Sequence, residues 1–197
     1  VVRRFPMIPG IDLVGIVEQC GNNKFAVGQH VLLNGYGVGE KYLGGLSQKA
    51  RINSEFLIPL PKDITPFNAM AIGTAGYTAM LSVMALEKQG ITPESGSILV
   101  TGATGGVGSF AIRILAELGY SITASTGSNK QAQYLKQLGA NEIIDRAELS
   151  AEGKPLMKER WAAAIDSVGS TTLVNVCASI KYGGCVAACG LAQGMDF

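Results

Sequence analysis

The predicted fold is decided by one glycine-rich stretch, Thr101-Gly102-Ala103-Thr104-Gly105-Gly106-Val107-Gly108. A short apolar run at 97–101 predicts a strand before it, and apolar residues at helical spacing predict a helix over 107–118. Glycines between a strand and a helix let the backbone approach a pyrophosphate, and the free N–H groups of the helix start then face the anion. The sequence therefore predicts a dinucleotide phosphate loop, with the pyrophosphate at Thr104, Gly105, Gly106 and Val107. A P-loop is excluded because no Gly-Lys-Ser/Thr follows.

Strands and helices alternate along the chain after this loop. Apolar runs predict strands at 120–124, 143–144, 162–166 and 185–189. Residues at helical spacing predict helices at 132–138 and 173–180. The alternation is typical of an α/β fold, namely a Rossmann-type doubly wound parallel sheet.

The run after the second strand, Ser125 to Lys130, contains no acidic residue. An Asp or Glu there would bind the ribose 2′-hydroxyl of NAD, whereas hydroxyls and a lysine can accept a 2′-phosphate. The sequence therefore favours NADPH, with its 2′-phosphate at Thr126, Gly127, Ser128 and Lys130. An ordinary helix N-cap by Ser128 or Thr126 is compatible with the same residues. Ligands lie beyond the carboxyl ends of such strands, so we expect Val168, Gly169, Gly190 and Leu191 near the nicotinamide.

Composition excludes several other classes of function. The chain has 197 residues and a formal net charge of +1, which argues against a nucleic-acid partner. No continuous apolar run approaches the roughly 18–20 residues that span a bilayer, so we expect no membrane association and a cytoplasmic location. His30 is the only histidine, which excludes a two-histidine metal site, and the four cysteines are interpreted as small core residues.

The N-terminal part has a different texture. Short apolar runs at 13–17, 31–33 and 56–58, separated by Gly, Asn and Pro, predict a β-rich region. A helix rich in Ala, Met and Leu is predicted over 68–88, and Gly73 and Gly76 weaken its beginning. We place the domain boundary between residues 72 and 73.

Six short motifs occur in order along the chain, at 9–17, 25–31, 44–48, 75–79, 166–169 and 183–186. They resemble those of medium-chain dehydrogenase/reductases of the zinc-free quinone oxidoreductase branch. Short-chain dehydrogenases share the phosphate loop but place it near the N-terminus and need a Tyr-x-x-x-Lys pair. This chain has no such pair, and a hundred residues precede its loop. The resemblance implies a partial GroES-like substrate domain over 1–72 and an NADP-binding Rossmann domain over 73–197.

Further stretches, at 5–12, 35–40, 72–81 and 182–191, resemble the acrylyl-CoA reductases within that branch. This resemblance implies NADPH-dependent reduction of acryloyl-CoA to propanoyl-CoA. Family members extend further at both ends, so it also implies an internal fragment that lacks the C-terminal part of the dinucleotide domain. Members of the branch are often homodimers, and we expect a homodimer here.

Zinc-containing members of the wider family carry a histidine and a cysteine where this chain has Ile11 and Ala71. Neither side chain can ligate zinc, so the resemblance implies a metal-free reaction. No residue is marked by its sequence context as the proton donor. Tyr36 and Tyr77 are weak candidates, each more naturally a packing or loop residue, and the donor could be water. We expect Asp12 to have a structural hydrogen-bonding role.

Two other functions fit the same features. Quinone reduction is the second enzymatic interpretation. A non-catalytic NADPH-binding protein, like the lens crystallins of this branch, is the third, because a fold alone does not determine a function.

Overall fold

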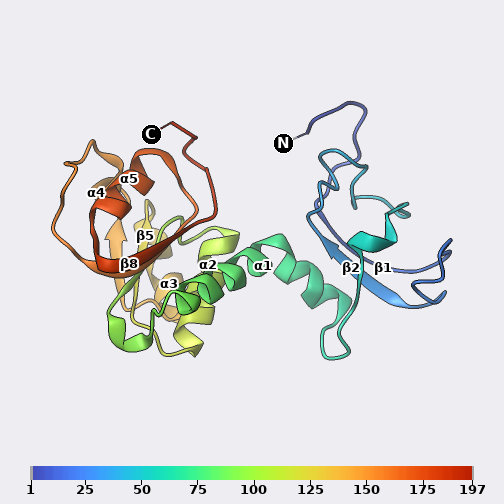
Figure 1. Ribbon diagram of the computed structural model, residues 1–197, viewed down its shortest axis with the longest axis horizontal. Helices are drawn as coiled ribbons and strands as arrows, with labels where there is room; N and C mark the ends of the chain where they lie inside the picture. Colours follow the sequence, from blue (N-terminus) through green and yellow to red (C-terminus); the bar gives the residue numbers. More distant parts are fainter. Residues whose placement is uncertain (1, 197) are drawn as a thin grey trace. The chain divides into compact units, whose positions relative to one another are not determined.

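The computed structural model describes residues 2–196 and divides into two compact units, Val1–Thr74 and Ala75–Phe197. The first unit holds a three-stranded sheet in the order β1-β2-β3, and the second a five-stranded sheet in the order β6-β5-β4-β7-β8 (Figure 1).

The first unit is built on antiparallel strands. β1 (Asp12–Ile16) pairs with β2 (His30–Asn34), and β2 pairs with β3 (Ile58–Pro59). Val31 and Leu33 in β2 are buried and alternate with more exposed neighbours, as expected of a sheet with one covered face. Of the run predicted as a strand at 56–58, Phe56 ends the 3₁₀ turn η1 (Ser54–Phe56), Leu57 follows that turn, and only Ile58 belongs to β3.

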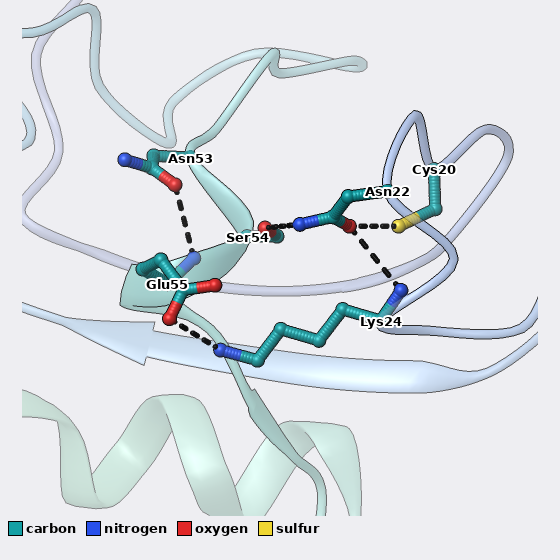
Figure 2. A network of polar contacts seen from close by, with 6 residues as sticks. All are labelled: Cys20, Asn22, Lys24, Asn53, Ser54 and Glu55. Carbon is teal, nitrogen blue, oxygen red and sulfur yellow. Dashed lines mark hydrogen bonds and ion pairs between the residues drawn. The ribbon is translucent and has the colours of Figure 1, made fainter.

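A polar network joins the loop after β1 to η1 (Figure 2). The Asn22 side-chain amide donates to Ser54 Oγ at 2.8 Å, and Lys24 Nζ pairs with Glu55 Oε2 at 3.0 Å. The Cys20 thiol lies 3.1 Å from Asn22 Oδ1, which also accepts from the Lys24 amide at 3.2 Å. These contacts hold Cys20 within a tight turn of backbone amides.

Helix α1 (Pro66–Lys88) is interrupted at Gly73, whose φ of 49° and ψ of −160° are not helical. The Asp12 carboxylate lies against this break. Its Oδ1 accepts hydrogen bonds from Thr74 N at 3.0 Å, Thr74 Oγ1 at 2.6 Å and Asn34 Nδ2 at 2.6 Å. A Cβ on Gly73 would lie 2.9 Å from Asp12 Oδ2, so only glycine fits the break. Asp12 thus has the structural role expected from the sequence.

By length and composition alone, α1 is apolar enough to cross a membrane, which the search for continuous apolar runs in the sequence missed. The break at Gly73 limits its second segment to residues 74–88, about 22 Å at 1.5 Å per residue. A hydrocarbon core is about 30 Å thick, so this segment is too short to span one unless the bilayer thins around it. One side of the segment, with Ala79, Val83 and Leu86, is buried in the core of the second unit.

The second unit is an all-parallel sheet. Its strands are β4 (Ile98–Val100), β5 (Ile122–Thr126), β6 (Glu142–Asp145), β7 (Trp161–Asp166) and β8 (Ile180–Ala188). Each neighbouring pair is parallel. Taken in chain order within this unit, the spatial order is 3-2-1-4-5, which is the doubly wound order. The order reverses between β4 and β7, so the carboxyl ends of these two strands mark the expected ligand crevice.

Helices cover both faces of this sheet. α2 (Gly106–Glu117) and α3 (Ala132–Leu138) lie on one side, and α4 (Ala147–Ser150) and α5 (Ser170–Ala178) lie on the other (Figure 1). The burial of β4 shows that both faces of the sheet are covered, because all three of its residues are fully buried. Ile98 and Val100 belong to the core under α1, α2 and α3, whereas Leu99 belongs to the core under α4 and α5. A strand covered on both faces reads as a continuous apolar run, as this one does.

The sequence placed one helix–strand boundary wrongly. The helix predicted over 173–180 is α5, which begins at Ser170 and ends at Ala178, and Ile180 already pairs with Trp161 in β8. The ladder is irregular between Ile180 and Cys185, where Gly183 has a φ of 77°. Such a bulge breaks the apolar pattern, so the sequence showed only the regular end of this strand.

Candidate dinucleotide site

The loop between β4 and α2 presents free backbone N–H groups. Gly105 is the N-cap of α2 and offers no side chain to bond the first turn. The first amide of the turn with an acceptor is Ser109, which donates to Gly105 O at 2.9 Å. Among the residues that the structure describes, the amides of Gly106, Val107 and Gly108 have no acceptor. A helix start of this kind binds anions through its amides and its dipole.

The glycines of this loop are required by close backbone approach. A Cβ on Gly108 would collide with the carbonyl oxygen of Gly102 and lie 2.7 Å from Ala103 Cα. A Cβ on Gly106 would lie 2.9 Å from the Ala75 side chain. The loop therefore packs directly on the start of α2 and leaves Thr104, Gly105 and Gly106 exposed. The four residues predicted at the pyrophosphate occupy this cradle, and no side chain fills it.

A buried polar contact joins β4 to β7, the two neighbouring strands between which the strand order reverses. Asp166 is fully buried at the end of β7, and its Oδ1 accepts from Thr101 Oγ1 at 2.5 Å. Its Oδ2 accepts from the Gly169 amide at 2.8 Å. The Ser167 hydroxyl donates to Thr101 O at 3.2 Å. The ends of β4 and β7 are thereby tied together beneath the phosphate loop.

The segment after β8 packs against the segment after β7, at the carboxyl edge of the parallel sheet. Cys189 N donates to Asp166 O at 2.8 Å, and Gln193 N donates to Val168 O at 2.8 Å. A Cβ on Gly190 would lie 2.5 Å from Ser167 O, so the two chain segments touch backbone to backbone. The structure thus brings together the four residues predicted after the fourth and fifth strands, namely Val168, Gly169, Gly190 and Leu191.

The end of β5 carries the residues predicted at the 2′-phosphate. Thr126 is buried, and its hydroxyl accepts from the Ser128 amide at 3.2 Å. Gly127 and Lys130 are exposed and Ser128 is half-buried. The N-cap alternative stays open for this run, because Ser128 directly precedes the 3₁₀ turn η3 (Asn129–Gln131) and its carbonyl oxygen accepts the Gln131 amide at 3.0 Å, whereas the N-cap of α3 itself is Gln131. Residues 126–130 therefore carry two hydroxyls, on Thr126 and Ser128, and one ammonium group, on Lys130.

Arg146 is a residue of this edge that the sequence analysis missed. It directly follows β6, and its amide donates to Thr126 O at 3.0 Å. Its side chain lies over Gly127, since a Cβ built there would collide with Arg146 Nε and lie 2.7 Å from Cδ. The sequence signal that could have indicated Arg146 is a basic residue directly after β6, the strand that pairs with β5.

The structure places the two candidate proton donors without partners for their hydroxyls. Tyr36, in the first unit, is 62% exposed and stacks on Phe56 with ring centroids 4.7 Å apart. Tyr77, in α1, is 55% exposed. Within residues 2–196 neither hydroxyl makes a hydrogen bond. Both assignments stay predictions.

Ile11 and Ala71, which the sequence resemblance places where zinc-containing relatives carry ligands, have side chains that cannot coordinate a metal. Ile11 and Ala71 are both exposed. Over the described part of the chain, no three His, Cys, Asp or Glu side chains are grouped so that they could hold a metal ion.

Comparison with known proteins agrees with the architecture. A family model for the alcohol dehydrogenase GroES-like domain matches residues 1–62, and one for the zinc-binding dehydrogenase domain matches residues 106–197. The chain is 50% identical over 194 residues to acrylyl-CoA reductase AcuI of Ruegeria pomeroyi, covering 98% of this chain and 59% of that protein. The chain thus spans about three-fifths of the length of the curated relatives it matches.

Solved structures of similar proteins have the same fold over nearly the whole of this chain. The crystal structure of Escherichia coli K-12 YhdH with bound NADPH has a TM-score of 0.96 and 52% identity, over 98% of this chain and 59% of that one. Bacillus subtilis yhfP, solved with NAD bound, has a TM-score of 0.92 and 45% identity, over the same shares of each chain. Together with the two domain matches, these similarities show that the chain belongs to the medium-chain dehydrogenase/reductase family, in which a GroES-like domain is joined to a dinucleotide-binding domain.

Proposed function

We propose that the second unit binds NADPH and that the whole protein uses it to reduce the activated C=C bond of acryloyl-CoA, giving propanoyl-CoA. One observation carries the cofactor assignment: the unbonded amides of 106–108 lie at the same sheet edge as the run 125–130, which has three hydroxyls, one lysine and no acidic residue. The 50% identity to a protein named acrylyl-CoA reductase supports the substrate.

The residues fit the proposed cofactor in two places. The amides at the start of α2 would hold the pyrophosphate, because each N–H already points out of a turn that no side chain caps. Thr126, Ser128 and Lys130 would surround the 2′-phosphate, since hydroxyls donate hydrogen bonds to phosphate and an ammonium supplies charge. A relative solved with NAD bound makes the preference for the phosphorylated cofactor a point that must be measured.

The reaction balances as acryloyl-CoA + NADPH + H⁺ → propanoyl-CoA + NADP⁺. When bound, NADPH would supply a hydride to the β-carbon. The protein must also stabilise the negative charge on the thioester oxygen and allow a proton to reach the α-carbon. Tyr36 and Tyr77 are hydroxyls of this chain that could serve in these roles. We propose that no zinc takes part, because Ile11 and Ala71 replace the family's zinc-ligand residues.

The test is a steady-state assay of NADPH oxidation, carried out on the full reading frame that contains this chain. Turnover with acryloyl-CoA, unaffected by a zinc chelator, is the expected result. Turnover with a small quinone alone would support the quinone oxidoreductase interpretation instead. NADPH binding without turnover of either substrate would favour a non-catalytic binding protein. A protein that binds no NADPH would overturn the proposal as a whole.

A further inference from the structure

We propose that a small pocket in the first unit binds the 3′-phosphoadenosine end of a coenzyme A thioester. This inference rests on the proposed function, because it names the part of the substrate that a simple quinone lacks. All the residues that line the pocket belong to the first unit.

The pocket combines apolar walls with a few polar groups. Val38 is buried and Ile52 and Phe56 are half-buried, whereas the other three lining side chains are exposed. The volume of the pocket is about 80 Å³, which admits one end of a ligand rather than a whole cofactor. Apolar and aromatic walls with a few polar groups are typical of a small-molecule site. The lining residues are Val38, Tyr42, Arg51, Ile52, Asn53 and Phe56.

Three aromatic rings meet at this pocket. Phe56 stacks on Tyr36 with ring centroids 4.7 Å apart and an interplanar angle of 15°, and the Tyr42 centroid lies 5.7 Å from that of Phe56. The backbone of Tyr36 has a φ of 52°, which is unfavourable for a tyrosine, yet the side chain is left 62% exposed. Exposed aromatic rings of this kind form a platform on which a nucleotide base can stack.

Asn53 adds a hydrogen-bond donor to the pocket. Its Oδ1 accepts the Glu55 amide at 3.0 Å at the start of η1, and its Nδ2 points away from that contact (Figure 2). Within residues 2–196, Nδ2 has no acceptor. The adenine ring carries nitrogen acceptors on its edge, so a side-chain amide with a free donor suits this base.

Arg51 supplies the charge that a phosphate needs. Over residues 2–196, the ion pairs of this unit join Lys24 to Glu55 and Lys49 to Glu18, and no carboxylate pairs with Arg51. A guanidinium presents two parallel N–H donors that match a phosphate. The pocket therefore favours a base that carries a phosphate over an uncharged quinone ring.

Two molecules of the proposed reaction carry a phosphoadenosine group, namely NADPH and the coenzyme A thioester. The unbonded amides at the start of α2 and the run 125–130 account for NADPH in the second unit. The pocket in the first unit is therefore assigned to coenzyme A, and the experiment below separates the two ligands.

The test compares Arg51→Gln with Lys49→Gln in the protein encoded by the full reading frame that contains this chain. Lys49 is the matched control, because it is an exposed cation two positions away that pairs with Glu18. Coenzyme A and 3′-dephospho-coenzyme A are titrated into protein saturated with NADPH, and NADPH is titrated separately. Arg51→Gln should weaken coenzyme A about tenfold or more, and leave 3′-dephospho-coenzyme A and NADPH within about twofold. Lys49→Gln should change none of the three.

Kinetics and a second pair of variants test the same pocket. For acryloyl-CoA, Arg51→Gln should raise KM about tenfold at unchanged kcat, whereas the kinetics with acryloyl-pantetheine, which lacks the nucleotide, should not change. Tyr42→Leu should weaken coenzyme A and 3′-dephospho-coenzyme A alike, about fivefold or more, because a ring for stacking is lost. Tyr42→Phe keeps the ring and should bind both as the unmodified protein does.

The outcomes separate the inference from the proposed function. Unchanged coenzyme A affinity in Arg51→Gln, or equal losses for coenzyme A and 3′-dephospho-coenzyme A, would overturn the inference even if acryloyl-CoA is reduced. A parallel loss of NADPH affinity would overturn it as well, since the pocket would then serve NADPH. The expected binding pattern in a protein that reduces no thioester would support the pocket and overturn the proposed function.

Discussion

Thr101 and Asp166 form a side-chain hydrogen bond of 2.5 Å at the point where the strand order of the sheet reverses. Both residues are buried, and 65 positions separate them in the chain. The contact joins the strand that enters the phosphate loop to the strand that precedes Val168 and Gly169. The geometry of the cofactor edge therefore depends on one hydroxyl and one carboxylate that need not touch the cofactor.

Thr101→Val should destabilise the second unit by about 1.5–3 kcal/mol, because a hydrogen bond to a buried carboxyl group is lost while the shape of the side chain is kept. Trp161 is the only tryptophan and lies in β7, so its fluorescence during urea unfolding reports this unit. Thr171→Val, a substitution of a half-buried threonine on α5, is the control. Equal unfolding midpoints for the two variants would contradict the importance of the contact.

Gly108→Ala should lower NADPH affinity by about tenfold or more, about 1.4 kcal/mol, because the added methyl group collides with the Gly102 carbonyl and displaces the phosphate loop. Isothermal titration measures the change. Gly21→Ala is the control, since its added Cβ would have no atom within 4 Å. NADPH affinity that survives in Gly108→Ala would place the pyrophosphate elsewhere.

Asp12→Ala should expose the Thr74 amide, which now donates to the Asp12 carboxylate at 3.0 Å. Loss of the acceptor allows the start of the second α1 segment to fray, so hydrogen exchange at Thr74 should accelerate by about tenfold or more. Asp63→Ala, at an exposed position, should leave this rate unchanged. If Thr74 stays equally protected in Asp12→Ala, the carboxylate does not hold the break in α1.

The cysteines should react with iodoacetamide in a fixed order as the pH rises. A backbone hydrogen bond with Phe25 is the main factor that lowers the pKa of the Cys20 thiol. Burial raises the pKa of Cys189, and the Asp166 charge adds to that effect. The thiolate is the reactive form, so half-maximal labelling of Cys20 should occur at a lower pH than that of Cys189. Peptide mass spectrometry across a pH series checks the order, and the reverse order would refute it.

Much of the second unit follows from the sequence because each strand and helix has its own local signal. β4, α2 and α3 lie within a few residues of their predicted bounds, since their apolar spacing is regular and glycine ends two of the segments. α4 has four residues, too few for any period to show, and the bulge in β8 hides the first half of that strand. Irregular geometry of this kind depends on contacts between segments distant in sequence.

The position of the predicted cofactor residues at the carboxyl edge of the parallel sheet also follows from the sequence, with one exception. A strand, a glycine loop and a helix in succession identify a phosphate loop locally, and the residues after each strand follow from parallel packing. Arg146 could not be placed this way, because the direction of its side chain depends on the space above Gly127. Likewise, the Asp12 contact with Thr74 bridges 62 positions and needs the break in α1 to form.

The most direct test of the account is a titration with NADPH and with NADH of the protein encoded by the full reading frame that contains this chain, followed by backbone amide NMR. We expect the amides of Gly106, Val107 and Gly108 to shift with both cofactors, because both carry the pyrophosphate. Those of Ser128, Lys130 and Arg146 should shift strongly with NADPH only, and NADPH should bind at least about tenfold more tightly. Equal affinities, or saturable shifts confined to residues away from this edge of the sheet, would contradict the central claim.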